Sequence, residues 1–110
     1  MADTSKVLSQ TIPSATTLTD SYTVPGATST VLSSFTVCNQ SPTVDAAFRI
    51  SVAVAGAADT PKQYIYYDLP LQAKDTFAGT LGITLAATDV VRVYASTANL
   101  SFNFFGVEVT

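Results

Sequence analysis

The chain has 110 residues, of which 47% are hydrophobic and only 12% are charged, with a formal net charge of −3. This length fits a single domain with its own core, and the hydrophobic content excludes a disordered chain. The five Lys and Arg residues are scattered, whereas a nucleic acid partner requires clustered basic side chains, so we expect no nucleic acid partner.

Residues 1–15 are the least regular part of the sequence. They show no charged segment followed by an apolar run, so we expect no signal peptide, and the chain lacks the run of ~18 apolar residues that a membrane span requires. We therefore expect synthesis in a cytoplasm and no membrane partner. We expect residues 1–15 to form an arm that reaches a neighbouring subunit, a frayed terminus, or a first strand over residues 6–11.

From residue 16 onward, apolar and polar residues alternate with a period of two, which is typical of strands that place one face on a core. One clear run places Phe48, Ile50, Val52 and Val54 on the same face. Turn-forming residues separate the runs at short intervals. The expected strands are residues 6–11, 17–24, 29–39, 46–55, 63–69, 76–85, 90–96 and 100–109. This pattern predicts an all-β fold, an antiparallel β-sandwich or jelly roll of about eight strands, with residues 16–110 as one domain.

Two positions within these strands call for a local explanation. Cys38 is the sole cysteine, so it cannot form a disulfide within the chain, and at a strand position we expect a small buried apolar residue. Phe104 and Phe105 are adjacent, so the alternation slips there before it resumes at Val107. A β-bulge, or a strand buried on both faces, would explain this slip.

A tyrosine-rich run from Tyr64 to Asp68 is the main candidate for a contact surface. Regular alternation places Tyr64 and Tyr66 on one face of the strand and Tyr67 on the other. Tyrosine combines a large apolar area with a polar hydroxyl group, so these residues and Asp68 could anchor a subunit contact or stack on a sugar. Alternatively, one face lies in the core and the other is a rim whose hydroxyl groups reach water.

Arg49 and Arg92 complete the set of interface candidates. Each lies opposite an apolar row of its strand, and either could pair with an acidic residue of a neighbouring chain. Otherwise each is a solvated side chain, and an exposed ion pair of this kind contributes at most about 1 kcal/mol.

Catalytic chemistry is poorly represented in the sequence. The chain contains no His, so the Ser-His-Asp and Cys-His arrangements and histidine metal ligands are absent. The eight acidic residues are spread singly along the chain, whereas a glycosidase requires two opposed carboxylates. We therefore expect no enzymatic activity, no metal and no cofactor.

Five ordered stretches carry a resemblance to a known group of proteins. They are residues 22–28 (Tyr-Thr-Val-Pro-Gly-Ala-Thr), 35–40 (Phe-Thr-Val-Cys-Asn-Gln), 63–70 (Gln-Tyr-Ile-Tyr-Tyr-Asp-Leu-Pro), 81–85 (Leu-Gly-Ile-Thr-Leu) and 89–95 (Asp-Val-Val-Arg-Val-Tyr-Ala). In this order they resemble small structural proteins of tailed bacteriophages, including cyanophage-like ones. The resemblance implies a β-sandwich placed on the head, tail or fibres of the virion, and it supplies no catalytic residue.

Two functional hypotheses follow. The scarcity of charge and the abundance of Ser and Thr suit a surface that other subunits cover without desolvating many ions. The first hypothesis is therefore a structural protein of the virion, as a capsid decoration or cement protein or a tail or neck component, with other virion proteins as partners and a homo-oligomer such as a trimer. The second is a fibre-associated receptor- or carbohydrate-binding module that uses Tyr64, Tyr66, Asp68 and an exposed Asn39 or Asn103. A monomer with a threonine-rich surface is the remaining alternative.

Overall fold

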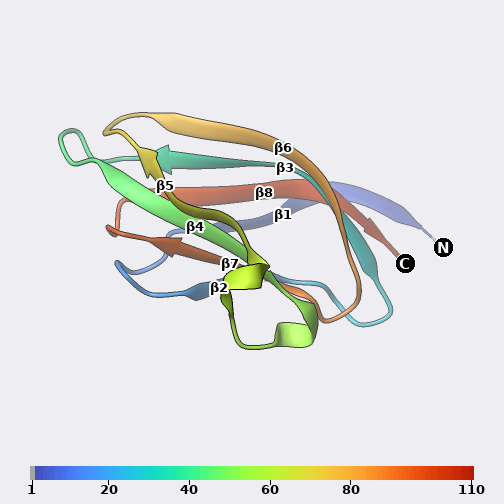
Figure 1. Ribbon diagram of the computed structural model, residues 1–110. Helices are drawn as coiled ribbons and strands as arrows, with labels where there is room; N and C mark the ends of the chain where they lie inside the picture. The colour runs from blue at the N-terminus through green and yellow to red at the C-terminus, as the bar shows by residue number, and fades with distance from the viewer. Residues whose placement is uncertain (1) are drawn as a thin grey trace.

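The computed structural model describes residues 2–110 as two four-stranded antiparallel sheets that stack into a β-sandwich (Figure 1). The strands are β1 (Asp3–Thr11), β2 (Thr19–Thr23), β3 (Ser29–Asn39), β4 (Ala46–Ala53), β5 (Tyr64–Leu71), β6 (Thr76–Leu85), β7 (Val90–Ala95) and β8 (Leu100–Val109). One sheet has the order β1-β8-β3-β6 and the other β2-β7-β4-β5, which is the strand order of a jelly roll. The predicted all-β fold is confirmed, and every strand begins and ends within three residues of its predicted bounds.

Strand β1 is an edge strand of the chain's own sandwich. It pairs antiparallel with β8, beginning with Asp3 opposite Val109. The two ends of the chain lie beside each other in Figure 1, and Ala2 and Thr110 exchange backbone hydrogen bonds. Residues 3–11 are therefore a strand within this fold, the third of the expected alternatives.

The core lies between the sheets and is dominated by phenylalanine. Phe35, Phe48, Phe102 and Phe104 are each 0% exposed. The ring centroids of Phe35 and Phe104 are 5.9 Å apart, and those of Phe48 and Phe102, which come from opposite sheets, are 6.0 Å apart. Burial of one such ring contributes about 1.5–3 kcal/mol, so the apolar strand faces are what hold the two sheets together.

The adjacent Phe104 and Phe105 point to opposite sides of β8. Phe104 is in the core, while Phe105 is partly exposed on the outer surface of its sheet. The extra residues that shift the register lie in the neighbouring strands, at Leu8 of β1 and Ser33 of β3. The expected β-bulge is therefore present at this position, but its extra residues belong to the neighbouring strands, and the side chains of β8 itself alternate without interruption.

Strand β4 ends earlier than the alternation predicts. Its last residue is Ala53, and the chain then turns at the short 3-10 helix η1 (Val54–Gly56), where Ala55 has a φ of 53°. Val54 is consequently 71% exposed and does not join the core face on which it was expected. The left-handed conformation at Ala55 diverts the chain away from the sheet at this point.

The segment 54–63 folds back over the outer surface of β4. It contains a second short 3-10 helix, η2 (Pro61–Gln63), which leads into β5. Ser51, which faces outward on β4, is 0% exposed because this segment covers it. Neither helical turn in the described part of the chain is long and apolar enough to cross a membrane.

Candidate functional site

Two irregularities in β5 decide where the tyrosine side chains point. The pairing of β5 with β4 shifts between Phe48 and Ile50, and again between Ile50 and Ser51. Each shift places an extra residue in β5. Asp68 lies in the first shift with a φ of 52°, a conformation that is uncommon for residues other than glycine. The second shift, whose extra residue is Ile65, places Tyr64 and Tyr67 on the same face, although a regular strand would separate them.

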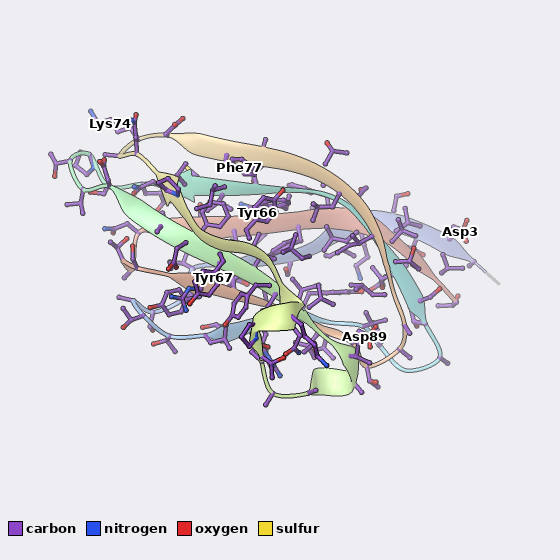
Figure 2. The ribbon with its side chains drawn as sticks, viewed as in Figure 1. Asp3, Tyr66, Tyr67, Lys74, Phe77 and Asp89 are labelled. Carbon is purple, nitrogen blue, oxygen red and sulfur yellow. The ribbon has the colours of Figure 1, made fainter. Side chains whose placement is uncertain are left out.

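The tyrosine faces consequently differ from the prediction. Tyr64 and Tyr67 are in contact, with ring centroids 5.0 Å apart and ring planes at 83°. Tyr66 instead packs against the core, with its ring centroid 5.4 Å from that of Phe35 and 5.5 Å from that of Phe77. Figure 2 shows Tyr66 close to Phe77 and Tyr67 apart from both. The expected pairing of Tyr64 with Tyr66 is therefore wrong.

Arg49 on β4 is held by three side chains of its own chain. Its Nε and Nη2 atoms donate to the two carboxylate oxygens of Asp68 at 2.6 and 3.2 Å. The guanidinium carbon lies 4.2 Å from the ring centroid of Tyr67 and 4.3 Å from that of Tyr94. The hydrogen bonds from Arg49 lower the pKa of Asp68, and those to Asp68 raise the pKa of Arg49. The pair is therefore ionised and mutually satisfied at neutral pH.

Arg92 on β7 fastens the segment 54–63 to the sheet. Its guanidinium donates to the carboxylates of Asp20 and Asp59 at 2.8 and 2.7 Å, and to the backbone carbonyl groups of residues 56–57 at 3.0 and 2.7 Å. The side chains of Arg92 and Asp59 are only 13% and 6% exposed. The hydrogen bonds to Asp20 and Asp59 raise the pKa of Arg92. The expectation of a solvated side chain is wrong for Arg92, which is a largely buried tether.

A pocket of about 460 Å³ opens between the segment 54–63 and β5. Its lining consists of Asp59, Thr60, Pro61, Tyr64 and Tyr67. Tyr67 is 59% exposed, whereas the carboxylate of Asp59 also accepts a hydrogen bond from the hydroxyl group of Ser51 at 2.6 Å. The pocket therefore has an exposed aromatic ring on one side and, on the other, a carboxylate that Ser51 and Arg92 hold in place.

The two asparagines that were candidates for sugar contacts lie away from this pocket. Asn39 is 1% exposed, and its side chain donates to the carbonyl groups of Val44 and Leu71 at 3.0 and 3.2 Å. Its amide oxygen accepts from the backbone N–H of Ser41 at 3.0 Å. The expectation of an exposed Asn39 is wrong, because this amide ties together the loops at one end of the sandwich. Asn103 lies on β8, on the outer surface of the other sheet.

The outer surface of the sheet β1-β8-β3-β6 carries no charged side chain over four successive rows. Residues paired directly across strands share a face, so the register identifies the members of each row. The rows are Ser5, Val107, Val31 and Thr84; Val7, Phe105, Ser34 and Thr80; Gln10, Asn103, Thr36 and Ala78; and Ser101, Cys38 and Thr76. We call these four rows the uncharged face. Cys38 is partly exposed there, so its expected burial is wrong.

The charged groups of this sheet lie at its ends or between the sheets. Figure 2 shows Asp3 and Lys74 at opposite ends of the sandwich. Lys6 and Glu108 form an ion pair at 3.1 Å, and the hydroxyl group of Tyr22, from the opposite sheet, donates to Glu108 at 2.6 Å. Burial and the contact with Glu108 raise the pKa of Tyr22 to about 12, while the hydrogen bonds from Tyr22 and Lys6 lower the pKa of Glu108.

Most of the predicted interface residues gather on the other side of the molecule. Tyr64, Tyr67, Asp68, Arg49 and Arg92 lie on the outer surface of the sheet β2-β7-β4-β5, which we call the charged face, and Tyr66 is the exception because it packs against the core. Sequence reasoning missed Tyr94 and the pocket residues of the segment 54–63. The spacing of Thr60 and Gln63, which form a capping box around Pro61, could have indicated that this segment is ordered.

Comparisons with known proteins do not assign the chain to a family. No protein-family model matches it, and no curated protein matches it. Within residues 2–110, no three His, Cys, Asp or Glu side chains gather closely enough to hold a metal ion. The function is therefore inferred from the residues of the two outer faces.

Proposed function

We propose that the chain is a structural subunit of a tailed-phage particle, and that it acts by packing its uncharged face against other protein chains. The observation that carries this proposal is the distribution of charge between the two outer faces. The uncharged face has no ionised side chain, whereas the charged face pairs two arginines with three carboxylates. The resemblance of residues 20–96 to structural proteins of tailed phages supports the assignment to a particle.

The composition of the uncharged face favours a protein partner. It mixes hydroxyl groups with valine and phenylalanine side chains, and Val7 is 48% exposed on it. Burial of this surface removes apolar area from water, and the hydroxyl groups can form hydrogen bonds to a partner without the desolvation of an ion. A chain that functions alone usually keeps charged residues dispersed over such a surface.

The size of the uncharged face fits a specific interface. The four rows span about seven or eight residues of each strand, which rise ~3.3 Å per residue and lie ~4.8 Å apart, so the uncharged face covers roughly 450 Å² if it is treated as flat. A stable protein interface buries about 800 Å² on each partner. The uncharged face therefore supplies somewhat more than half of the required area, and an adjoining strand edge would supply the rest.

Strand β6 offers such an edge. Proteins usually guard exposed edges with charge, proline, bulges or short strands. Of the other three edge strands, β5 has two shifts of register and Pro70, β2 has five residues, and β1 carries Lys6 and a bulge. Strand β6 has ten residues with neither charge nor proline, and its one protecting feature is the extra residue near Gly82 at the shift in its pairing with β3. We infer that a second copy of the chain docks against β6 and the uncharged face, which gives a homo-oligomer.

Charge placed on the uncharged face tests the assembly. We expect the isolated protein to be oligomeric, and Thr36→Lys and Thr80→Lys to convert it to a monomer because each buries an ammonium group in the interface. Size-exclusion chromatography with light scattering, over a range of protein concentrations, measures this change.

The matched control is Thr23→Lys, an exposed threonine on β2 of the other sheet. We expect this variant to assemble like the unmodified protein. A monomeric unmodified protein at high concentration, or equal effects of the three substitutions, would contradict assembly through the uncharged face.

The assignment to a particle has a separate test. In purified particles of the phage that encodes the chain, quantitative mass spectrometry should find it at high copy number, and cryo-electron microscopy should place the uncharged face against another subunit. Absence of the chain from complete particles would remove the phage assignment while leaving the assembly measurement unaffected.

A further inference from the structure

We propose that the pocket between the segment 54–63 and β5 binds one neutral pyranose ring of a glycan. Its volume of about 460 Å³ accommodates a sugar residue and lies within the ~300–1,000 Å³ that ligand sites commonly occupy. The pocket is on the charged face, opposite the uncharged face. Binding there would add a recognition activity to the proposed assembly, and both could operate in the same molecule.

The aromatic wall of the pocket exists because β5 departs from a regular strand. The register shift at Ile65 brings Tyr64 to the same face as Tyr67, and the shift at Asp68, with its left-handed conformation, turns Tyr67 away from the core side on which Leu69 packs. A left-handed residue other than glycine costs free energy, and bulges of this kind often re-aim a side chain beside a functional site. Here the result is a tyrosine ring that remains 59% exposed. The core gains nothing from this ring, which is available to a ligand.

The walls of the pocket are fixed in advance. Arg49 stacks on Tyr67 and is itself held by Asp68. On the opposite wall, Asp59 binds Arg92 at 2.7 Å, and the side chain of Gln63 accepts a hydrogen bond from the backbone N–H of Thr60. A site that is ordered before binding avoids the entropy cost of ordering its side chains when the ligand arrives.

The charges around the pocket select the class of ligand. Arg49 and Arg92 are both neutralised by carboxylates of the chain, so neither guanidinium is free to bind a phosphate or a carboxylate group. The acid that lines the pocket, Asp59, already has two partners and contributes an acceptor, and Thr60 contributes a hydroxyl group. These groups suit a neutral ligand with one apolar face and several hydroxyl groups, which describes a pyranose.

The expected binding mode follows from the chemistry of the lining. The C–H groups on one face of the sugar ring would lie against a tyrosine ring, and its hydroxyl groups would donate to Asp59 and exchange hydrogen bonds with Thr60. Pro61 would close the remaining apolar side. Because one ring is covered at a single pocket, we expect weak binding by one chain, strengthened by avidity when several copies are assembled.

A glycan array identifies the ligand, and NMR locates it. We expect the protein to bind neutral hexose or N-acetylhexosamine oligosaccharides on the array. Titration of the best array ligand into ¹⁵N-labelled protein should then shift signals of residues 59–67. We expect Tyr67→Ala to weaken binding by about tenfold or more through loss of the stacking wall. The control Ile65→Ala changes an exposed apolar residue of the same strand outside the pocket and should bind normally.

Several results would overturn the proposal. These are the absence of any neutral binder on the array, a preference for sialylated or phosphorylated glycans, or equal effects of Tyr67→Ala and Ile65→Ala. A titration with a proline-rich peptide, the other ligand that tyrosine-lined grooves accept, would also overturn it if the peptide shifted the signals of residues 59–67 and the glycan did not. Tyr67→Phe keeps the aromatic wall, so retained binding by this variant confirms that stacking is responsible.

Discussion

The charged face and the uncharged face belong to the same sandwich, but they leave different groups available to a partner. On the charged face, Arg49 lies between two tyrosine rings and binds Asp68, and Arg92 binds two carboxylates and two carbonyl groups. On the uncharged face, the outward side chains carry no charge and project away from the sandwich, so they form no ion pairs of this kind.

This difference shows that charge on a strand does not by itself mark a contact surface. The arginines of this chain form ion pairs with carboxylates of the same chain, and these ion pairs order the face on which they lie. The surface with the fewest charges is the one whose hydrogen-bonding and apolar groups remain unused. The charged face holds the segment 54–63 in place, and we propose that the uncharged face associates with other chains. Separate substitutions test these two roles.

The largest effect on stability should come from removal of the Arg92 tether. We expect Arg92→Ala to lower the free energy of unfolding by about 3 kcal/mol, because it leaves the carboxylate of Asp59, only 6% exposed, without its cation. Urea denaturation measures the loss. Arg92→Lys keeps the charge and should recover part of the stability, since an ammonium group cannot reproduce all the contacts of the guanidinium. A loss well below about 1 kcal/mol for Arg92→Ala would show that the tether is dispensable.

A smaller effect is expected at Arg49, which is more exposed to solvent. Arg49→Lys should lower the free energy of unfolding by about 1 kcal/mol, because it loses the planar stacking between Tyr67 and Tyr94 and the two-point contact with Asp68. A double-mutant cycle with Tyr94→Leu measures the coupling between the cation and the ring. Strict additivity of the two substitutions would indicate that the stacking contributes nothing.

Glu108, which binds Lys6 of its own sheet and Tyr22 of the opposite sheet, gives a pH-dependent effect. The folded-state pKa of Glu108 is lower than its ordinary value of 4.5, because Tyr22 and Lys6 bind its carboxylate. The stability that this group contributes is thus present above about pH 4.5 and is lost as the pH falls through the lower folded-state pKa. We expect Glu108→Gln to be less stable at neutral pH and to lose less stability on acidification. Urea denaturation measures the free energy of unfolding of both proteins as the pH falls. An equal loss in the unmodified protein and in Glu108→Gln would exclude this contribution.

The smallest effect on stability is expected on the uncharged face. Thr80→Lys should change the free energy of unfolding of the dissociated chain by no more than about 0.5 kcal/mol, since the side chain points to solvent from an edge strand. Urea denaturation at low protein concentration tests this value. A large loss would mean that Thr80 supports the fold, and a change in oligomeric state could then no longer be attributed to the interface alone.

Alternation along the strands was sufficient to locate most of the fold. The outward threonines of β6 and the inward Phe77 follow the predicted period of two. The same period along their own strands predicts that Phe35 and Phe102 face the core. Such local patterns survive because each strand must bury one face on the core, whatever the strand next to it is. The candidate site was less predictable, since Tyr66 and Tyr67 exchanged their expected roles.

The exchange has a non-local cause. The register shifts of β5 are defined only by its pairing with β4. Aspartate tolerates the left-handed conformation better than most residues, but nothing in the sequence distinguishes Asp68 from the other aspartates. The same is true of Arg92, whose partners Asp20 and Asp59 are 72 and 33 residues away along the chain. No pattern within one strand could have shown that these charges meet.

The sequence by itself determined the all-β class, the positions of the eight strands and the scarcity of charge, because these depend on residue type and on a period of two within each strand. Only the tertiary structure decided which outer face would collect the arginines, where Tyr67 would point and which surface would be left without charge. Strand order and register set these properties, and they arise from contacts between residues that are distant in the chain.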